Sequence, residues 1–174
     1  MQLTRKTSLQ HRFKHKSALV GLAVVLAPAL IHGQTRTGAL DTSFGTGGTV
    51  ITDFAGAYAG AAAVAIQADG KVVAAGTVVG DQGWHFALVR YNTDGALDTG
   101  FGTGGRVTTD FGGIYEVATS VAVQPDGKIV VVGGSVIGYF NDFALARYNT
   151  DGTLDAGFGV GGKVLTDFGV SATA

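Results

Sequence analysis

The chain contains no cysteine, which excludes disulfide bonds and any thiol chemistry. Basic residues are scarce after residue 33, where seven lysines and arginines stand against all 13 acidic residues, a formal charge of −6. Because nucleic-acid-binding surfaces need clustered lysine and arginine, this charge distribution argues against such a partner. The same part of the chain has no useful length of helical periodicity, so we expect it to be all-β.

The N-terminal segment 1–33 has the opposite character, because it is basic and contains no acid. An uncharged run from Ala18 to Ile31 follows this basic start. The length of the run suits the apolar core of a secretory signal, about 7–15 residues, and falls short of the roughly 20 needed to span a bilayer. The pattern predicts a signal peptide over 1–33, cleaved after Ala29 or Gly33, with an uncleaved anchor or a core helix as the alternative. The mature protein would then be secreted, periplasmic or on the cell surface, with no stable membrane span.

The segment 40–96 returns as 97–153 without insertion or deletion. The two copies match at 33 of 57 positions, and the opening Leu40-Asp41 comes back a third time as Leu154-Asp155. A fixed period of this size indicates an array of one supersecondary unit, whose apolar face is buried only by neighbouring copies.

Each unit contains four strand-like segments, the first two joined by an Asp-Gly hairpin turn. They are expected at 63–67, 71–77, 85–91 and 106–111 in the first unit, and at 120–124, 128–133, 142–148 and 162–168 in the second. Four strands with short turns favour a blade of a β-propeller. A stacked β-solenoid is the alternative, although its repeats are usually shorter, about 20–30 residues. The predicted fold is an all-β array of two four-stranded antiparallel blades, over 61–111 and 118–168, with a tail at 170–174.

One further strand-like segment, 49–54, precedes the first blade without three strands of its own. The last blade already has a fourth strand, so this orphan N-terminal strand has no blade to complete. Two blades are also fewer than the 4–8 of a closed propeller. We therefore predict an incomplete ring, which is a fragment, a truncated reading frame, or a protomer that self-associates through open blade edges.

The recurring motif runs Phe-Ala-Leu-x-Arg-Tyr-Asn-Thr-Asp-Gly-x-Leu-Asp-x-x-Phe-Gly-x-Gly-Gly-x-Val, starting at Phe86 and again at Phe143. With the Gln-x-Asp-Gly-Lys turns at 67–71 and 124–128, it resembles the delta-60 repeat family of bacterial, mostly exported proteins. The resemblance covers roughly residues 36–169 and implies a β-propeller without shared catalytic residues. The chain departs from the family pattern in having so few repeats.

Two turns carry oxygen-bearing side chains at alternate positions before a glycine, which partly matches a calcium-binding loop. The candidate ligands for a weak calcium site are Asn92, Asp94, Asp98, Asn149, Asp151 and Asp155. A third early ligand and a distal bidentate acid are not evident, so a polar turn whose side chains bond their own backbone is the favoured alternative. No other cofactor is expected. The glycine-rich segments 45–48, 102–105 and 159–162 are each followed by a strand rather than a helix, which favours loops over phosphate sites.

Two arginines, Arg90 and Arg147, lie on expected strands with no acid beside them in sequence. Asp53, Asp110 and Asp167 each precede a phenylalanine at a strand end. Because a charged group near a core needs a partner, we expect an Arg–Asp pair between neighbouring strands or blades.

His85 is the only histidine after the leader, and no nucleophile–base–orienter set or histidine-rich metal site can be recognised from spacing. The connection between the second and third strands differs most between the copies, and loops carry binding function on rigid scaffolds. Trp84, His85, Tyr139 and Phe140 are therefore the candidates for contact with an unknown protein or glycan partner, with drifting surface sequence as the alternative.

These features together favour an exported, non-enzymatic repeat scaffold or interaction module. The competing hypothesis is a fragment of a propeller lyase or hydrolase whose active site lies in further blades.

Overall fold

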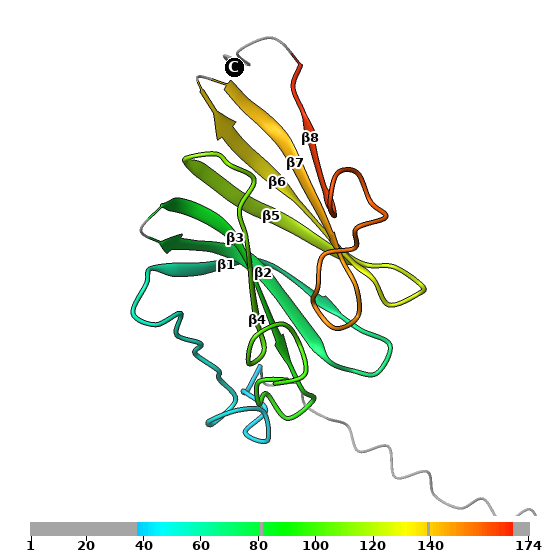
Figure 1. Cartoon of the computed structure of the whole chain (residues 1–174). Coiled ribbons are helices and arrows are strands. Elements are labelled where there is room, and N and C mark those ends of the chain that lie inside the picture. The colour runs from blue at the N-terminus through cyan, green and yellow to red at the C-terminus, as the bar shows by residue number, and fades with distance from the viewer. Residues whose placement is uncertain (1–37, 81, 139, 169–174) are drawn as a thin grey trace, which may run out of the picture. The chain divides into compact units, whose positions relative to one another are not determined.

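The computed structural model describes residues 38–80, 82–138 and 140–168; the expected signal peptide, the expected tail and Tyr139 lie outside these residues. The described residues form eight strands and no helix (Figure 1). The strands are β1 (Ala59–Ile66), β2 (Val72–Gly80), β3 (Gly83–Tyr91), β4 (Arg106–Thr109), β5 (Tyr115–Val123), β6 (Ile129–Ile137), β7 (Phe140–Tyr148) and β8 (Lys163–Thr166). Accordingly, no helix long and apolar enough for a membrane span occurs in this part of the chain.

The strands make two four-stranded sheets, in the orders β1-β2-β3-β4 and β5-β6-β7-β8, and every neighbouring pair is antiparallel. This confirms the predicted all-β fold with two open four-stranded sheets, which we call blade one and blade two. Both blades carry a register shift at the same place in the repeat, between Ala61 and Ala63 and between Ala118 and Ser120. The repeated sequence therefore specifies the irregularities of the sheet as well as its strands.

The hairpin turn between the first two strands of each blade has the geometry that its sequence predicts. Gly70 and Gly127 have φ angles of 83° and 82°, a region that glycine enters without steric cost. The aspartate before each glycine accepts a hydrogen bond from a backbone N–H two positions on, at 3.1 Å from Asp69 to Lys71 and from Asp126 to Lys128. A backbone bond closes each turn, from Gln67 N to Lys71 O and from Gln124 N to Lys128 O, both at 2.8 Å.

The first two strands of each blade extend further than the sequence indicates. β1 begins at Ala59 and β2 continues to Gly80, through alanine- and glycine-rich segments with little hydrophobic alternation. Gly76 is opposite Ala61 in the ladder, and an added Cβ at Gly76 would clash with the backbone of Gly60. Small residues therefore allow close approach of the two strands here, and the pairing itself extends them.

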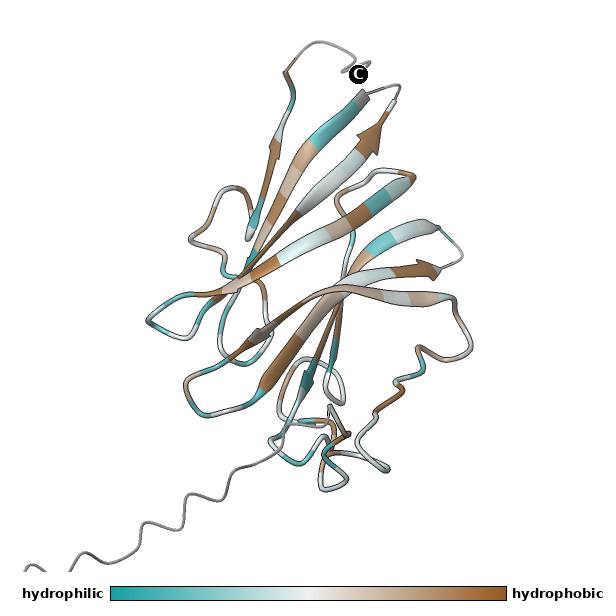
Figure 2. Cartoon of the chain, turned by 180° about the vertical axis from the view of Figure 1, so that it is seen from behind, coloured by the Kyte–Doolittle hydropathy of each residue, from teal (hydrophilic) through white to brown (hydrophobic). Residues whose placement is uncertain are grey.

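The two blades share one hydrophobic core, and apolar residues run along the strands of both (Figure 2). Strand β5 of blade two lies against β1, β2 and β3 of blade one. The buried residues of this core are Val73, Ala75, Phe86, Leu88, Phe101 and Phe111 from blade one and the segments after it, and Ala118, Ile129, Val131, Ala144, Ala146 and Tyr148 from blade two. Each blade thus contributes one face to a common core, as expected for stacked repeats.

The orphan strand expected at 49–54 is not a strand. Residues 50–53 pair with no strand of the described part of the chain, and Thr49 and Phe54 make only isolated bridges to Thr46 and Ala57. In the blades, the corresponding segments pair with the third strand. Among the described residues, no third strand is paired with 49–54, so this segment does not form a strand.

Candidate functional site

The two strand arginines pair with aspartates other than those expected. Arg90 Nε donates to Asp98 Oδ2 at 2.7 Å, and Lys71 Nζ donates to the same oxygen at 2.9 Å. Arg147, Lys128 and Asp155 repeat this arrangement at the same two distances in blade two. The ion pairs of Arg90 and Arg147 are therefore with Asp98 and Asp155, and the predicted pairing with Asp53 or Asp110 is wrong.

The reason for the different pairing lies in the turn after the third strand. The backbone N–H of Asp98 donates to the carbonyl of Arg90 at 2.9 Å, and Leu97 forms a bridge with Tyr91. The chain thus folds back on its own strand and places the aspartate beside the arginine that precedes it in sequence. Arg90 also lies over the ring of Phe101, 4.4 Å from its centroid, and donates to the carbonyl of Thr150 in blade two.

The expected calcium ligands are largely engaged within the chain. Besides its two cations, Asp98 accepts the backbone N–H of Gly100 through Oδ1 at 3.1 Å. Asp94 and Asp151 accept backbone N–H groups two positions on, from Ala96 and Thr153. The geometry is that of the polar turn named above as the alternative. Calcium binding by these aspartates, with Asn92, Asn149 and Asp155, stays a prediction, and the ion would have to compete with lysine and arginine.

Acid is expected to weaken both blades through these aspartates. The Lys71 ammonium is the first cause that lowers the pKa of Asp98, and Lys128 does the same for Asp155. A carboxyl whose pKa is lower in the folded protein stabilises it above the unfolded value of about 3.9, and this contribution is lost as the pH falls through the folded value. Thermal unfolding between pH 6 and pH 2 should show the midpoint falling mainly below about pH 4. A midpoint that stays constant down to pH 2 would contradict these pairs.

The glycine-rich segments 102–105 and 159–162 form tight loops that precede strands, as predicted, whereas 45–48 precedes residues 49–54, which are not a strand. In the second copy, Phe101 N donates to Asp98 O at 3.0 Å and Gly105 N to Phe101 O at 2.9 Å. The loop also joins the blades, because Gly102 N donates to Asp151 O at 2.7 Å. The same bond recurs one repeat earlier, from Gly45 N to Asp94 O at 2.8 Å.

The contact between the blades buries a pair of aromatic rings. Phe86 on β3 and Phe111 after β4 lie with their centroids 4.9 Å apart and are 0% and 8% exposed. The equivalent pair in blade two, Phe143 and Phe168, has centroids 5.4 Å apart but is 58% and 65% exposed. The surface of blade one that carries this aromatic pair is therefore covered by blade two, whereas the equivalent surface of blade two is exposed. We call the open surface, defined by Phe143 and Phe168, the outer face of blade two.

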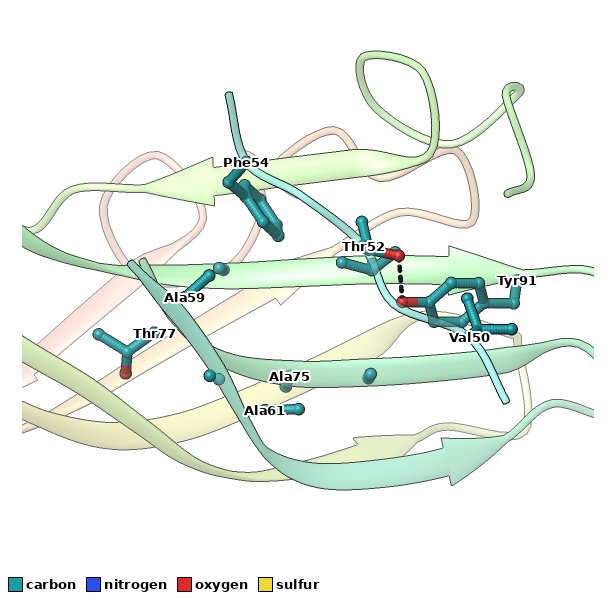
Figure 3. A pocket seen from close by; sticks show the side chains of 13 residues that line it. Val50, Thr52, Phe54, Ala59, Ala61, Ala75, Thr77 and Tyr91 are labelled. Carbon is teal, nitrogen blue, oxygen red and sulfur yellow. Dashed lines mark hydrogen bonds between the residues drawn. The ribbon is translucent and has the colours of Figure 1, made fainter. Parts of the chain in front are cut away.

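The opposite side of blade one is partly covered by residues 50–54, which cross it as Figure 3 shows. Thr52 and Tyr91 share a hydrogen bond between their hydroxyls at 2.7 Å, and Thr109 and Tyr148 share the equivalent bond at 2.7 Å between the blades. The segment thus occupies the position that the fourth strand of a preceding blade would take. Burial raises the pKa of Tyr148 to about 12, while Tyr91 is only half-buried.

A cavity of about 190 Å³ lies between this segment and the sheet of blade one. Small side chains of the sheet, among them Ala59 and Ala61, line it together with the larger Phe54 and Tyr91 (Figure 3). Farther along β1, Val64 and Ile66 are 65% and 72% exposed, whereas their copies Val121 and Val123 pack against the core. We call this surface, defined by Ala61, Val64, Ile66 and Tyr91, the outer face of blade one.

A second feature lies where β3, β5 and the segment after β4 meet. His85 Nδ1 is 3.5 Å from Glu116 Oε2 and 3.8 Å from Asp110 Oδ1. Glu116 is fully buried, and its Oε1 accepts the backbone N–H groups of Phe111 and Gly113 at 2.8 and 2.9 Å. Burial is the first cause that raises the pKa of Glu116. Within the part of the chain that the structure describes, neither Glu116 Oε2 nor His85 Nδ1 has a hydrogen-bond partner.

Ser135 borders this group of residues. It is opposite Glu116 in the β5–β6 ladder, and its buried hydroxyl also has no hydrogen-bond partner among the described residues. An added Cβ at Gly113 would lie 2.8 Å from the backbone oxygen of Val136 and 2.5 Å from Ser135 Oγ, so the close approach of the segment 111–113 to β6 favours glycine. His85, Asp110 and Glu116 are named the inter-blade cluster below.

Of the residues expected to contact a partner, Trp84 and His85 lie in different surroundings. Trp84 is half-buried and stacks on Tyr115, with centroids 4.5 Å apart, and approaches Tyr58 at 6.4 Å. His85 belongs to the inter-blade cluster. Phe140 begins β7, and Tyr139 lies outside the described residues. Partner contact by these four residues stays a prediction.

Sequence reasoning missed Glu116 and Ser135, yet a signal was present. Glu116 is the only glutamate of the chain, and His85 is the only histidine after residue 33. Their equivalents one repeat away are Ala59 and Asp142, and the equivalent of Ser135 is Val78. Three departures from the repeat therefore meet at one place in the structure.

Residues 67–101 and 124–158 each match a family described as "Domain of unknown function (DUF5122) beta-propeller". The two matches begin at equivalent positions of the repeat and cover the hairpin turn, the second and third strands and the loop that follows. The repeats are of the propeller type. No curated protein matches the chain. These propeller-type repeats resemble the delta-60 family in the motif given above, and membership of that family stays a prediction.

Proposed function

We propose that this protein is an exported, non-enzymatic module that associates with further propeller-type blades, and first of all with a second copy of itself. Export follows from the basic and apolar character of residues 1–33. Association would take place between the outer face of blade two and the outer face of blade one of the next copy. The two faces differ, so such contacts are head-to-tail and lead to a ring or an open chain of blades.

The exposed Phe143–Phe168 pair is the observation that carries this proposal. The same pair in blade one is buried by blade two, so the chain itself contains an example of the contact that the outer face of blade two can make. Exposed, contiguous apolar surface of this kind commonly marks an interaction site.

A second copy is the partner that fits this surface best. Blade two covers blade one with Ala118, Val121 and Val123 of β5. Blade one presents Ala61, Val64 and Ile66 at the same positions of the repeat, and these are exposed. The next copy can thus repeat the contact with nearly identical side chains.

Residues 50–54 compete for part of the same surface. Thr52 is hydrogen-bonded to Tyr91. By analogy with the Thr109–Tyr148 bond, Thr166 of another copy would make this bond to Tyr91 in place of Thr52. Head-to-tail association would therefore exchange Thr52 for the Thr166 of the second copy. This exchange makes the segment a removable cap and predicts weak, concentration-dependent association.

Sedimentation equilibrium of the purified chain over a range of concentrations tests the proposal. The mean mass should rise with concentration, and Phe143→Asp and Val64→Asp should each hold the chain at the monomer mass. Because each variant keeps one face intact, an equimolar mixture of the two should form a heterodimer. Ile114→Ser is the matched control, since Ile114 is 72% exposed and lies on neither outer face.

Two results would contradict the proposal in different ways. A chain that stays monomeric at every concentration would remove self-association altogether. Loss of association with Phe143→Asp but not with Val64→Asp, and no heterodimer in the mixture, would indicate symmetric pairing of two blade-two faces.

A further inference from the structure

We propose that the inter-blade cluster binds a divalent transition-metal ion of the zinc class. The ligands are His85 on β3, Asp110 after β4 and Glu116 on β5. The ion would therefore join blade one to blade two, at a place that the repeat pattern does not create in either blade alone. This site is separate from the outer faces and does not depend on self-association.

The donor atoms already have the spacing of a metal site. His85 Nδ1, one oxygen of Asp110 and one oxygen of Glu116 all lie within 4.8 Å of one another. The two separations from the imidazole nitrogen are 3.5 and 3.8 Å. Tetrahedral zinc with bonds of about 2.0–2.2 Å places its ligands roughly 3.4 Å apart. Small side-chain rotations would therefore complete the coordination.

Glu116 supplies the observation that points to a cation. Two backbone N–H groups fix its Oε1, whereas its fully buried Oε2 faces the cluster without a hydrogen-bond partner among the described residues. The imidazole nitrogen at 3.5 Å is too distant for a good hydrogen bond. A buried, unpartnered carboxylate oxygen is costly, and a coordinated cation would remove that cost.

The ligand types select the class of metal. A neutral imidazole with two carboxylates suits zinc and neighbouring transition metals, whereas calcium and magnesium prefer oxygen ligands alone. Three protein ligands leave a fourth position for water. The Asp110 side chain is 61% exposed, which gives an ion access from solvent.

Cobalt titration of the full chain, purified without a histidine tag, measures this site. Tetrahedral Co²⁺ should give visible absorption that saturates at one equivalent and disappears when Zn²⁺ is added. Trp84 is the only tryptophan of the chain and precedes His85, so its fluorescence should be quenched in the same titration. Zn²⁺ should also raise the melting temperature, because it binds the folded state.

The aspartates provide a matched pair of variants. Asp110→Asn should weaken Zn²⁺ binding by at least about tenfold, the lower bound seen for changes even outside the direct ligands. Asp53→Asn changes the equivalent residue of the preceding copy and should leave binding unchanged. Glu116→Gln should abolish saturable binding. Because Asp110 is exposed, we expect Asp110→Asn to fold. This variant therefore tests the metal site even if Glu116→Gln fails to fold.

Absence of one-equivalent uptake of Co²⁺ or Zn²⁺ by the folded chain would overturn the proposal. Equal affinities of the unchanged chain, Asp110→Asn and Asp53→Asn would also overturn it, since binding would then lie elsewhere.

Discussion

Replacing Phe86 with alanine is expected to lower the free energy of unfolding by about 3–5 kcal/mol, the cost of removing a buried phenylalanine from a packed core. Phe86 is 0% exposed and packs on Phe111 in the core that both blades share. Because a domain of this size is stable by only about 5–15 kcal/mol, the variant would lose a large part of its total stability. Urea unfolding at low temperature measures this difference.

Phe143→Ala is the matched control, because Phe143 holds the same position in blade two and is 58% exposed. We expect it to cost less than about 1 kcal/mol in the monomer. Both variants are to be measured at low protein concentration, where association does not protect Phe143. Similar losses for the two phenylalanines would show that blade two is already covered and that the difference between the faces is absent in solution.

Asp98→Asn is expected to lower the free energy of unfolding by about 2 kcal/mol, because removal of one partner leaves a buried charge uncompensated. Arg90 is 7% exposed and would lose the carboxylate that accepts the hydrogen bond from its Nε. The estimate is below the usual cost of breaking a buried pair because Lys71 is partly solvated and can turn to water.

Asp155→Asn gives the comparison in the second copy. Its arginine, Arg147, has a side chain that is 23% exposed against 9% for Arg90, because no further blade of the described chain covers it. The loss of stability should therefore be smaller than for Asp98→Asn in the same urea experiment. A larger loss for the blade-two variant would contradict the account of which arginine is buried by a neighbouring copy.

The period of the sequence was sufficient to predict the two four-stranded antiparallel sheets. Alternation of large and small residues and the Asp-Gly turns are local signals, and each is present twice in register. The prediction for 49–54 was wrong because a strand needs a partner as well as a β-forming sequence. The segment has the sequence of a fourth strand, but no third strand of the described chain forms a backbone ladder with it.

The partner of the arginine could not be predicted for a similar reason. Sequence reasoning looked for an acid across the sheet, whereas the turn after β3 brings Asp98 back to Arg90 on the same strand. The path of this turn is fixed by backbone hydrogen bonds, which cannot be predicted from a pattern of residue types. The sequence also makes Asp98 a candidate calcium ligand, whereas in the structure its carboxylate pairs with Lys71 and Arg90. A single aspartate in a turn thus fits both a calcium loop and an ion pair.

The inter-blade cluster illustrates a different limit. His85 and Glu116 lie on strands of different sheets, far apart in sequence, and they meet only because the two blades stack. A comparison of the copies shows that both residues are exceptions to the repeat, but it does not show that they face each other.

Each blade keeps its native structure by packing on the neighbouring blade. Native-state hydrogen exchange of the Phe86→Ala chain tests it most directly, because the amides of β6 in blade two lie on a different sheet from the substitution. We predict that protection of β6 falls together with that of β2 and by a similar factor. Full protection of β6 alongside strong loss in β2 would show that the blades are independent and would contradict the claim.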